Sequence, residues 1–308
     1  MPTEPRGRRW ARGLLVVGVL SLALVAGLVV LFNRGVGPLP DPEGCQARVG
    51  GVVVDLTTEQ AENAATIAAV AVGRGLPARA ASIALATAMQ ESKLRNLDHG
   101  DRDSLGLFQQ RPSMGWGTAR QIQDPYYAAN RFYDALVKID GYQSMRITEA
   151  AQEVQRSGFP QAYQDHAADG RALASALTGY SPARFGCVAR PATVVTQQAG
   201  PGALTPRARR VRRAIEHVFG PQHIDGVAAK GHSLDLLVRP AGADNRRRGW
   251  AMASYLVAQA DRLHIARVVF DRRSWHSGPS SEQRWRPYPT SCHRTALEYR
   301  DRVHVSVL

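Results

Sequence analysis

Hydrophobic residues recur at helical spacing through most of the first half of the chain. Over residues 79–94 the larger apolar side chains follow this period, and the alanines between them allow close packing. Ahead of an alanine-rich segment, Thr57 and Gln60 have the spacing of a capping box. The pattern predicts a mainly α-helical first half, with helices at residues 57–72, 79–94, 125–138, 148–157 and 169–177.

The last hundred residues mix two kinds of pattern. Helical spacing alternates there with short runs that are rich in valine and leucine, which is typical of strands. Such a mixture predicts a smaller α+β domain. The expected helices are residues 207–219 and 250–263, and the expected strands are 234–238, 266–270 and 303–308.

Two segments rich in glycine and proline divide the chain. Residues 33–44 and 188–206 have the composition of linkers. They leave one candidate domain at residues 45–187 and another at residues 207–308.

An apolar segment precedes the first linker. Residues 14–32 form an uncharged run of 19 residues, and four arginines lie in residues 1–13. As a helix this run would measure about 28 Å, enough to cross a hydrocarbon core. Basic residues before the run would hold the N-terminus in the cytoplasm. We therefore expect a single-pass cell-membrane anchor at 14–32, a cytoplasmic tail at 1–13 and an extracytoplasmic remainder; a cleaved signal peptide is the alternative.

The net charge of +13 is concentrated near the C-terminus. Residues 45–187 hold 14 basic and 14 acidic side chains, whereas residues 207–308 hold 19 and 9. The neutral block is not expected to bind polyanions. The basic block would attract nucleic acid, anionic lipid headgroups or an anionic wall polymer, and export of the chain would exclude nucleic acid.

The chain has three cysteines, and two of them bracket the neutral block. Pairing of Cys45 with Cys187 would close this domain at both ends, and a disulfide is permitted outside the membrane. Cys292 would then remain unpaired. The sequence also permits a different pairing.

Candidate chemistry lies in residues 88–117, AMQESKLRNLDHGDRDSLGLFQQRPSMGWG. Glu91 is near the end of an otherwise apolar helix, and partial removal from water favours a protonated carboxyl group. A protonated carboxylic acid is the proton donor that a glycosidic oxygen needs. Because a lone glutamate at a helix end is usually a solvated surface residue, the assignment depends on the residues that follow.

Those residues carry a resemblance to a known superfamily. The Glu91-Ser92 pair, followed by SLGLFQ at 104–109, resembles goose-type lysozymes and soluble lytic transglycosylases. GDRDSLGLFQQRPSMGWGT and the later AAQEVQRSGFPQAY are similar to exported actinobacterial lysozyme-like proteins. The resemblance spans nearly all of residues 45–187. It implies that the domain cleaves the MurNAc-GlcNAc β-1,4 bond of peptidoglycan glycan strands, with Glu91 as the catalytic acid and with substrate-binding residues Ser104, Gly106, Phe108, Gln109 and Gln110.

The chemistry of these residues is also suited to a sugar-binding cleft. Gly106 lets backbone approach a sugar closely, and the amides of Gln109 and Gln110 suit N-acetyl groups. The hydrophobic pattern and the resemblance together predict a mainly α lysozyme-like domain, a smaller α+β domain after it and a transmembrane helix before it.

The second catalytic group is less evident. Asp98, Asp101 and Asp103 follow Glu91 closely, but aspartates in a glycine-containing loop are more often turn formers. The resemblance implies a route with one carboxylate, in which the N-acetyl group of the substrate stabilises the cation. Lytic transglycosylases usually carry Ala-Tyr-Asn near residues 150–157, where Gln152 and Gln155 stand here. A catalytically inactive wall-binding or scaffolding protein of the same fold is therefore the alternative.

The C-terminal block resembles a second family. HSLDLLV at 232–238 and VHVSVL at 303–308 are similar to zinc D-alanyl-D-alanine carboxypeptidases and their non-catalytic relatives. Ala228 stands where that family has its essential histidine, and Arg302 replaces the first histidine of the closing pair. Asp235 and His304 alone make a poor zinc site. We expect a degenerate domain with no metal or other cofactor; a bifunctional hydrolase would need a working zinc site.

Overall fold

The computed structural model describes residues 43–159, 161–190, 199–200, 202–225, 231–288 and 299–307, together with positions 20, 21, 23 and 27. The chain divides into two units, Met1–Asp41 and Pro42–Leu308. Only the second is described below. Cys292 and Ala228 lie outside the described residues.

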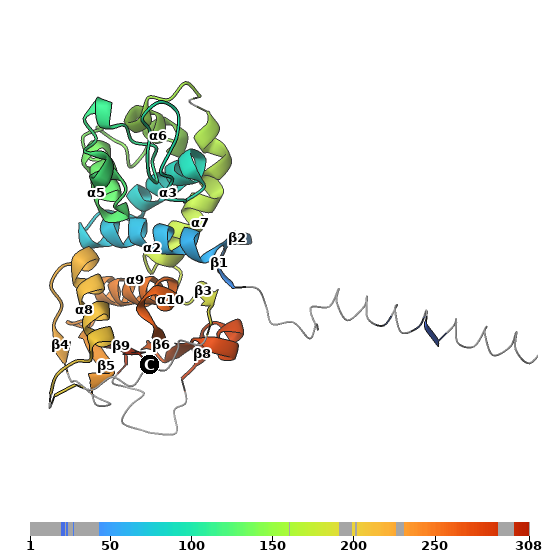
Figure 1. The fold of residues 1–308 in the computed structure, drawn as a ribbon, viewed down its shortest axis with the longest axis vertical. Helices are drawn as coiled ribbons and strands as arrows, with labels where there is room; N and C mark the ends of the chain where they lie inside the picture. The colour runs from blue at the N-terminus through green and yellow to red at the C-terminus, as the bar shows by residue number, and fades with distance from the viewer. Residues whose placement is uncertain are drawn as a thin grey trace, which may run out of the picture. The chain divides into compact units, whose positions relative to one another are not determined.

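The first part of this unit is built around helices (Figure 1). Helix α3 lies at its centre, in contact with α2, α5, α6 and α7. The predicted capping box is confirmed, because Thr57 and Gln60 each accept a hydrogen bond from the other's backbone amide. The helical elements are α2 (Thr58–Gly73), α3 (Ala78–Ser92), η1 (Pro112–Met114), α4 (Ala119–Ile122), α5 (Pro125–Leu136), α6 (Ile147–Gln155), η2 (Ala162–His166) and α7 (Ala167–Leu177).

A three-stranded antiparallel sheet corrects the expectation of a mainly α first domain. The order is β2-β1-β3, with β1 at Gly44–Val49, β2 at Val52–Leu56 and β3 at Phe185–Val188. Gly50 and Gly51 have φ of 56° and 83° and make the tight turn between β1 and β2. The pattern of hydrophobic residues did not predict this sheet, because its strands are short and because β1 and β3 come from opposite ends of the predicted domain.

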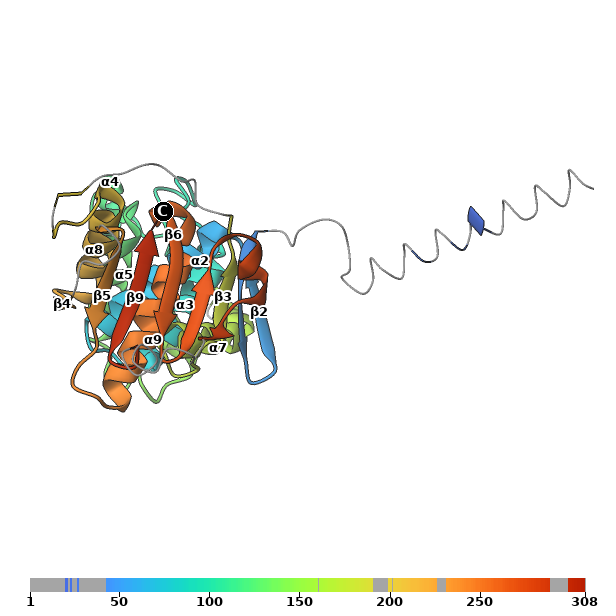
Figure 2. The same cartoon turned by 90° about the horizontal axis from the view of Figure 1, so that it is seen from below.

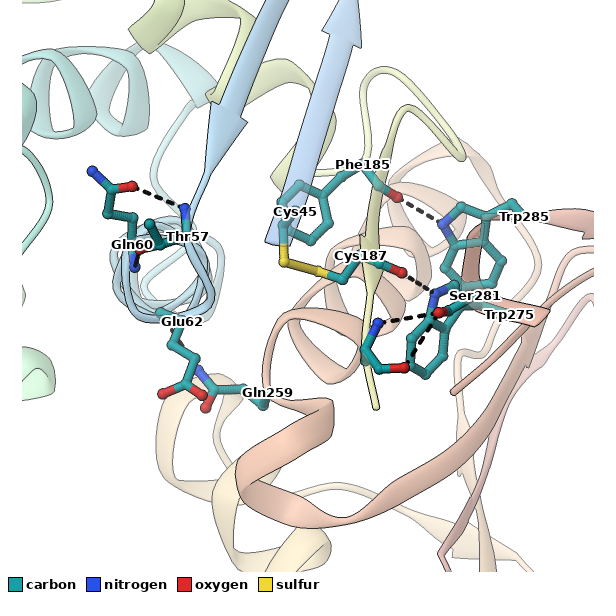
Figure 3. The surroundings of a disulfide bond; sticks show 11 residues. Cys45, Thr57, Gln60, Glu62, Phe185, Cys187, Gln259, Trp275, Ser281 and Trp285 are labelled. Atoms are coloured by element: carbon teal, nitrogen blue, oxygen red, sulfur yellow. Dashed lines mark hydrogen bonds between the residues drawn. A yellow bond between two sulfur atoms is a disulfide. The ribbon is translucent and has the colours of Figure 1, made fainter. Parts of the chain in front are cut away.

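The predicted disulfide is confirmed. Cys45 on β1 and Cys187 on β3 are direct cross-strand partners, and their sulfur atoms are bonded. Beside it, the indole groups of Trp275 and Trp285 donate to the carbonyl oxygens of Cys187 and Phe185 at 3.0 and 2.7 Å (Figure 3). The closing strand of the helical part is therefore also bound to the C-terminal part.

The C-terminal part contains a six-stranded antiparallel sheet in the order β4-β5-β9-β6-β7-β8. Strand β9, the last in sequence, lies between β5 and β6, and its valines pack toward the core. The strands are β4 (Ile224–Asp225), β5 (Ser233–Leu237), β6 (Ile265–Phe270), β7 (Arg273–His276), β8 (Arg286–Pro287) and β9 (Arg302–Val307). The helical elements are α8 (Pro206–Phe219), α9 (Ala243–Ala258), α10 (Ala260–Leu263) and η4 (Gly278–Gln283). The unit as a whole is mixed α/β with two antiparallel sheets.

The helical part and the six-stranded sheet are packed together through helices. Helix α9 covers one face of the sheet and also contacts α2 (Figures 1 and 2). The side-chain amide of Gln259 donates to the carbonyl oxygen of Glu62 at 3.1 Å. A Cβ at Gly73 would collide with the carbonyl oxygen of Val218, so glycine allows α2 to approach the end of α8.

The predicted membrane anchor and the location drawn from it are corrected. Within the described part of the chain, no helix is long and apolar enough to cross a membrane. A span needs about 20 consecutive apolar residues, whereas α2 and α9, both in the unit from Pro42 onward, have 16 residues each. Most of residues 14–32, where the anchor was expected, lie outside the described residues.

Candidate active site in the helical part

Glu91 lies in the last turn of α3. The helix ends because Lys93 and Leu94 adopt left-handed φ values of 53° and 61°. The Ser92 hydroxyl lies 2.8 Å from the carbonyl oxygen of Leu107. This contact ties the helix end to the turn that contains Leu107, so the two halves of the motif predicted from sequence lie together.

The carboxyl group of Glu91 has a buried tyrosine as its partner. The phenol of Tyr163, on η2, donates to Oε1 of Glu91 at 2.7 Å. Tyr163 is only 1% exposed. Burial raises the pKa of Tyr163. A hydrogen bond with Ser157 lowers this pKa, and the nearby Glu91 raises it, but burial is the largest effect. The phenol therefore stays protonated around neutral pH and can serve as a permanent donor to Glu91.

The turn after Glu91 is closely fitted. Leu105 and Gln110 form an isolated antiparallel bridge, and Gly106 lies between them with φ of 73°. A Cβ at Gly106 would lie 2.8 Å from the carbonyl oxygen of Ile122, so both the conformation and the space require glycine. Gln109 adopts a φ of 45°, a conformation that is uncommon for a residue with a side chain.

Phe108 contributes to this turn from the core side. Its ring is fully buried and stacks on Phe132 with 4.6 Å between ring centroids. Its carbonyl oxygen accepts a hydrogen bond from the side-chain amide of Gln155 at 2.8 Å. The ring thus supports the turn, and a substrate in the cleft would not reach it in this arrangement.

An open cleft of about 960 Å³ runs past Glu91. Three of the predicted substrate-binding residues line it: Ser104, Gln109 and Gln110. The other two, Gly106 and Phe108, lie behind the lining. Gln110 is 1% exposed, and its amide nitrogen donates to the Ala128 carbonyl oxygen. Its Oε1 has no hydrogen-bond partner among the described residues.

Two exposed apolar side chains on the cleft were not predicted from the sequence. Met114 and Phe159 line it and are 66% and 80% exposed. Trp116 also lines it and is partly buried against the core. The aromatic rings of Phe159 and Trp116 are flat apolar surfaces that suit the faces of pyranose rings. The exposure of Met114 and Phe159 depends on the folded loops, so the sequence carried no direct sign of it.

The other acidic residues near the cleft differ in their surroundings. Asp103 accepts hydrogen bonds from the Arg111 guanidinium at 2.7 Å and from the Ser113 amide at 2.8 Å. These bonds, led by that from Arg111, lower the pKa of Asp103. Asp103 is therefore a turn former, while Asp101 and Glu153 line the cleft.

Tyr163 is a further residue of the site that was not predicted from the sequence. At residues 150–157, the side chain of Gln152 is hydrogen-bonded to Ser157, and the side-chain amide of Gln155 donates to the Phe108 carbonyl oxygen. Tyr163 is the last residue of AAQEVQRSGFPQAY, a segment that carries the resemblance, but its contact with Glu91 is visible only in the folded chain.

In the C-terminal sheet, the structure brings together the two residues singled out by the carboxypeptidase resemblance. Asp235 on β5 and His304 on β9 are cross-strand partners, and Oδ1 lies 2.7 Å from Nδ1. Arg302 lies 3.7 Å from the other carboxylate oxygen. Among the residues that the structure describes, no group of three histidine, cysteine or acidic side chains is placed to hold a metal ion.

Comparison with known proteins bears on this C-terminal part. Residues 200–299 match a family described as VldE, C-terminal domain. The match covers less than half of the chain. It includes α8, α9 and strands β4 to β8, and it excludes the cleft around Glu91. A search of curated proteins finds no match to the chain.

Proposed function

We propose that this protein cleaves the β-1,4 bond between MurNAc and GlcNAc in peptidoglycan glycan strands, with Glu91 as the proton donor. The observation that carries the proposal is that Glu91 lines an open cleft and is paired with the buried phenol of Tyr163. The cleft volume lies in the range of ligand-binding sites. The motif at residues 104–110 and the exposed apolar side chains on the same cleft support a sugar polymer as the ligand.

The contact with Tyr163 gives the two carboxyl oxygens of Glu91 different roles. Oε1 accepts from the phenol, which orients the carboxyl group and leaves Oε2 to carry the proton. Donation of that proton to the glycosidic oxygen, O4 of GlcNAc, breaks the bond to C1 of MurNAc and leaves a carboxylate. The phenol is then the donor to the new negative charge, and such charge-assisted hydrogen bonds are stronger than neutral ones.

One carboxylate is sufficient for a lytic route. The N-acetyl group of the substrate stabilises the cation at C1. The Glu91 carboxylate then takes the proton of the MurNAc 6-hydroxyl, and O6 bonds to C1 to close a 1,6-anhydro ring. The proton thus returns to Glu91 and no water is consumed. The turn-forming role of Asp103 favours this route over one with a second carboxylate from that position.

Digestion of purified peptidoglycan followed by mass analysis of the products tests the proposal. Soluble fragments that end in 1,6-anhydro-MurNAc are expected. Fragments with a reducing MurNAc end would support the proposed glycosidase activity but would show that it proceeds by hydrolysis and not by the lytic route. Intact glycan after prolonged incubation would overturn the proposal and favour the inactive wall-binding protein.

A further inference from the structure

The six-stranded sheet has one face covered by helices and a second face that carries polar side chains. Because neighbouring side chains of a strand point to opposite faces, the buried valines of β9 place Arg302 and His304 on the other face. Figure 2 shows β5, β9 and β6 side by side with the helices behind them. We call this other face, with the side chains of β5 to β9 that lie on it, the polar face.

Two arginines and a histidine from three adjacent strands lie on the polar face. Arg267 of β6 and His276 of β7 are direct cross-strand partners, so they share a face. Arg286 of β8 pairs with Ser274, two residues before His276, which places it on that face as well. The β-sheet register therefore brings Arg267, His276 and Arg286 together.

Among the described residues, the guanidinium groups of these arginines have no acidic partner. Neither Arg267 nor Arg286 forms an ion pair with any residue in the described part of the chain, and the Nε atom of each is buried without a hydrogen-bond partner. Arg267 reaches Nε2 of His304 at 3.4 Å, and Arg286 donates to the Ser280 carbonyl oxygen at 3.2 Å. A charged group that is removed from water without a counter-ion costs free energy.

Among the described side chains, the carboxylate of β5 on the polar face is already engaged. Asp235 is paired with His304 at 2.7 Å and lies 3.7 Å from Arg302. It therefore does not neutralise Arg267 or Arg286, and no other described carboxylate forms an ion pair with either. The surroundings of His276 show the same excess of positive charge. Burial lowers the pKa of His276, and the nearby Arg267 and Arg286 lower it further.

An aromatic pair borders this cluster. The ring of Tyr299 packs against His304 at 5.4 Å and against Tyr288 at 5.3 Å between centroids. Burial raises the pKa of Tyr299, and the nearby Tyr288 and Asp235 raise it further. The phenol is therefore neutral and can donate a hydrogen bond beside the arginines.

We propose that Arg267, His276 and Arg286 form a binding site for an oxyanion group, a carboxylate or a phosphate, on the polar face of the C-terminal sheet. Planar guanidinium groups bind both kinds of group through paired N–H donors. The residues are distinct from the Asp235 and His304 pair of the carboxypeptidase resemblance. The site does not depend on the proposed glycosidase activity, and its ligand is either a free small anion or a group carried by a polymer.

Nuclear magnetic resonance of the full chain with ¹⁵N-labelled histidine tests the site. Inorganic phosphate and, separately, acetate are titrated while the His276 ring signals are followed, with their assignment made through a His276→Gln variant. A saturable shift is expected from at least one of the two anions. The Arg267→Gln and Arg286→Gln variants should each weaken binding at least about tenfold.

The matched control is Arg273→Gln. Arg273 is exposed on β7 and, three residues from His276, lies on the opposite side of the strand, so the variant should bind like the wild type. A soluble polyphosphate separates the two sources: binding at least 100-fold tighter per chain than inorganic phosphate indicates a polymer, and equal affinity per phosphate group indicates a free anion. Absence of a saturable shift with both small anions, or an equal loss in Arg273→Gln and in a folded Arg286→Gln variant, would overturn the proposal.

Discussion

Replacement of Tyr163 by phenylalanine isolates the contact on which the proposed mechanism depends. The substitution removes the hydroxyl that lies 2.7 Å from Glu91 Oε1 and keeps the buried ring. A hydrogen bond to a charged group contributes about 1.5–3 kcal/mol. Because about 1.4 kcal/mol corresponds to a tenfold change in rate, we expect kcat to fall roughly 10- to 150-fold. KM should change little, since Tyr163 does not line the cleft.

The assay is the initial rate of soluble fragment release from purified peptidoglycan over a range of substrate concentrations. Tyr133→Phe is the matched control, because Tyr133 is also fully buried and its hydroxyl donates to the Ile67 carbonyl oxygen at 3.0 Å. That variant loses a buried hydrogen bond of comparable length without touching Glu91. If Tyr163→Phe retains wild-type kcat, or loses no more than Tyr133→Phe, the assignment of Tyr163 as the positioning residue is refuted.

Three further predictions concern stability. Removal of the Cys45–Cys187 disulfide by a double alanine substitution should lower the free energy of unfolding by up to roughly 4–5 kcal/mol, because the bond closes a sequence separation of 142 residues; an unchanged urea midpoint would contradict this. Burial raises the pKa of Glu62, so its contribution to stability is present when it is protonated and is lost as the pH rises through the raised pKa. Glu62→Gln should therefore stabilise the protein at neutral pH and not at strongly acidic pH, whereas a pH-independent difference in urea unfolding would argue against it. Gly73→Ala should lower the thermal midpoint by several degrees, since its Cβ would collide with the Val218 carbonyl oxygen; a midpoint equal to wild type would show that α2 and α8 adjust freely.

The helices and the local part of the site could be predicted because their signals are close together in sequence. The capping box at Thr57 and Gln60 involves a spacing of three residues, and the structure has it. Glu91 and Gln109 lie within one segment, and both line the same cleft. One long-range contact could also be predicted, because Cys45 and Cys187 lie at the two ends of the domain, and their disulfide is confirmed.

The remaining features depend on contacts between distant segments. Tyr163 reaches Glu91 across 72 residues of sequence, and no periodic pattern links the two. The three-stranded sheet joins strands that come from opposite ends of the helical part, so helical spacing did not reveal it. Phe108 has a flat aromatic ring of the kind that binds sugars, yet tertiary packing places this ring against Phe132.

The most direct test of the central claim is the rate of glycan cleavage by a Glu91→Gln variant, measured as fragment release from purified peptidoglycan. The amide keeps the shape of the side chain and its hydrogen-bond acceptor for Tyr163, but it has no acidic proton to donate. We predict loss of cleavage to background with wild-type stability, while a Glu149→Gln variant of the exposed residue on α6 keeps full activity. Wild-type cleavage by Glu91→Gln would contradict the account.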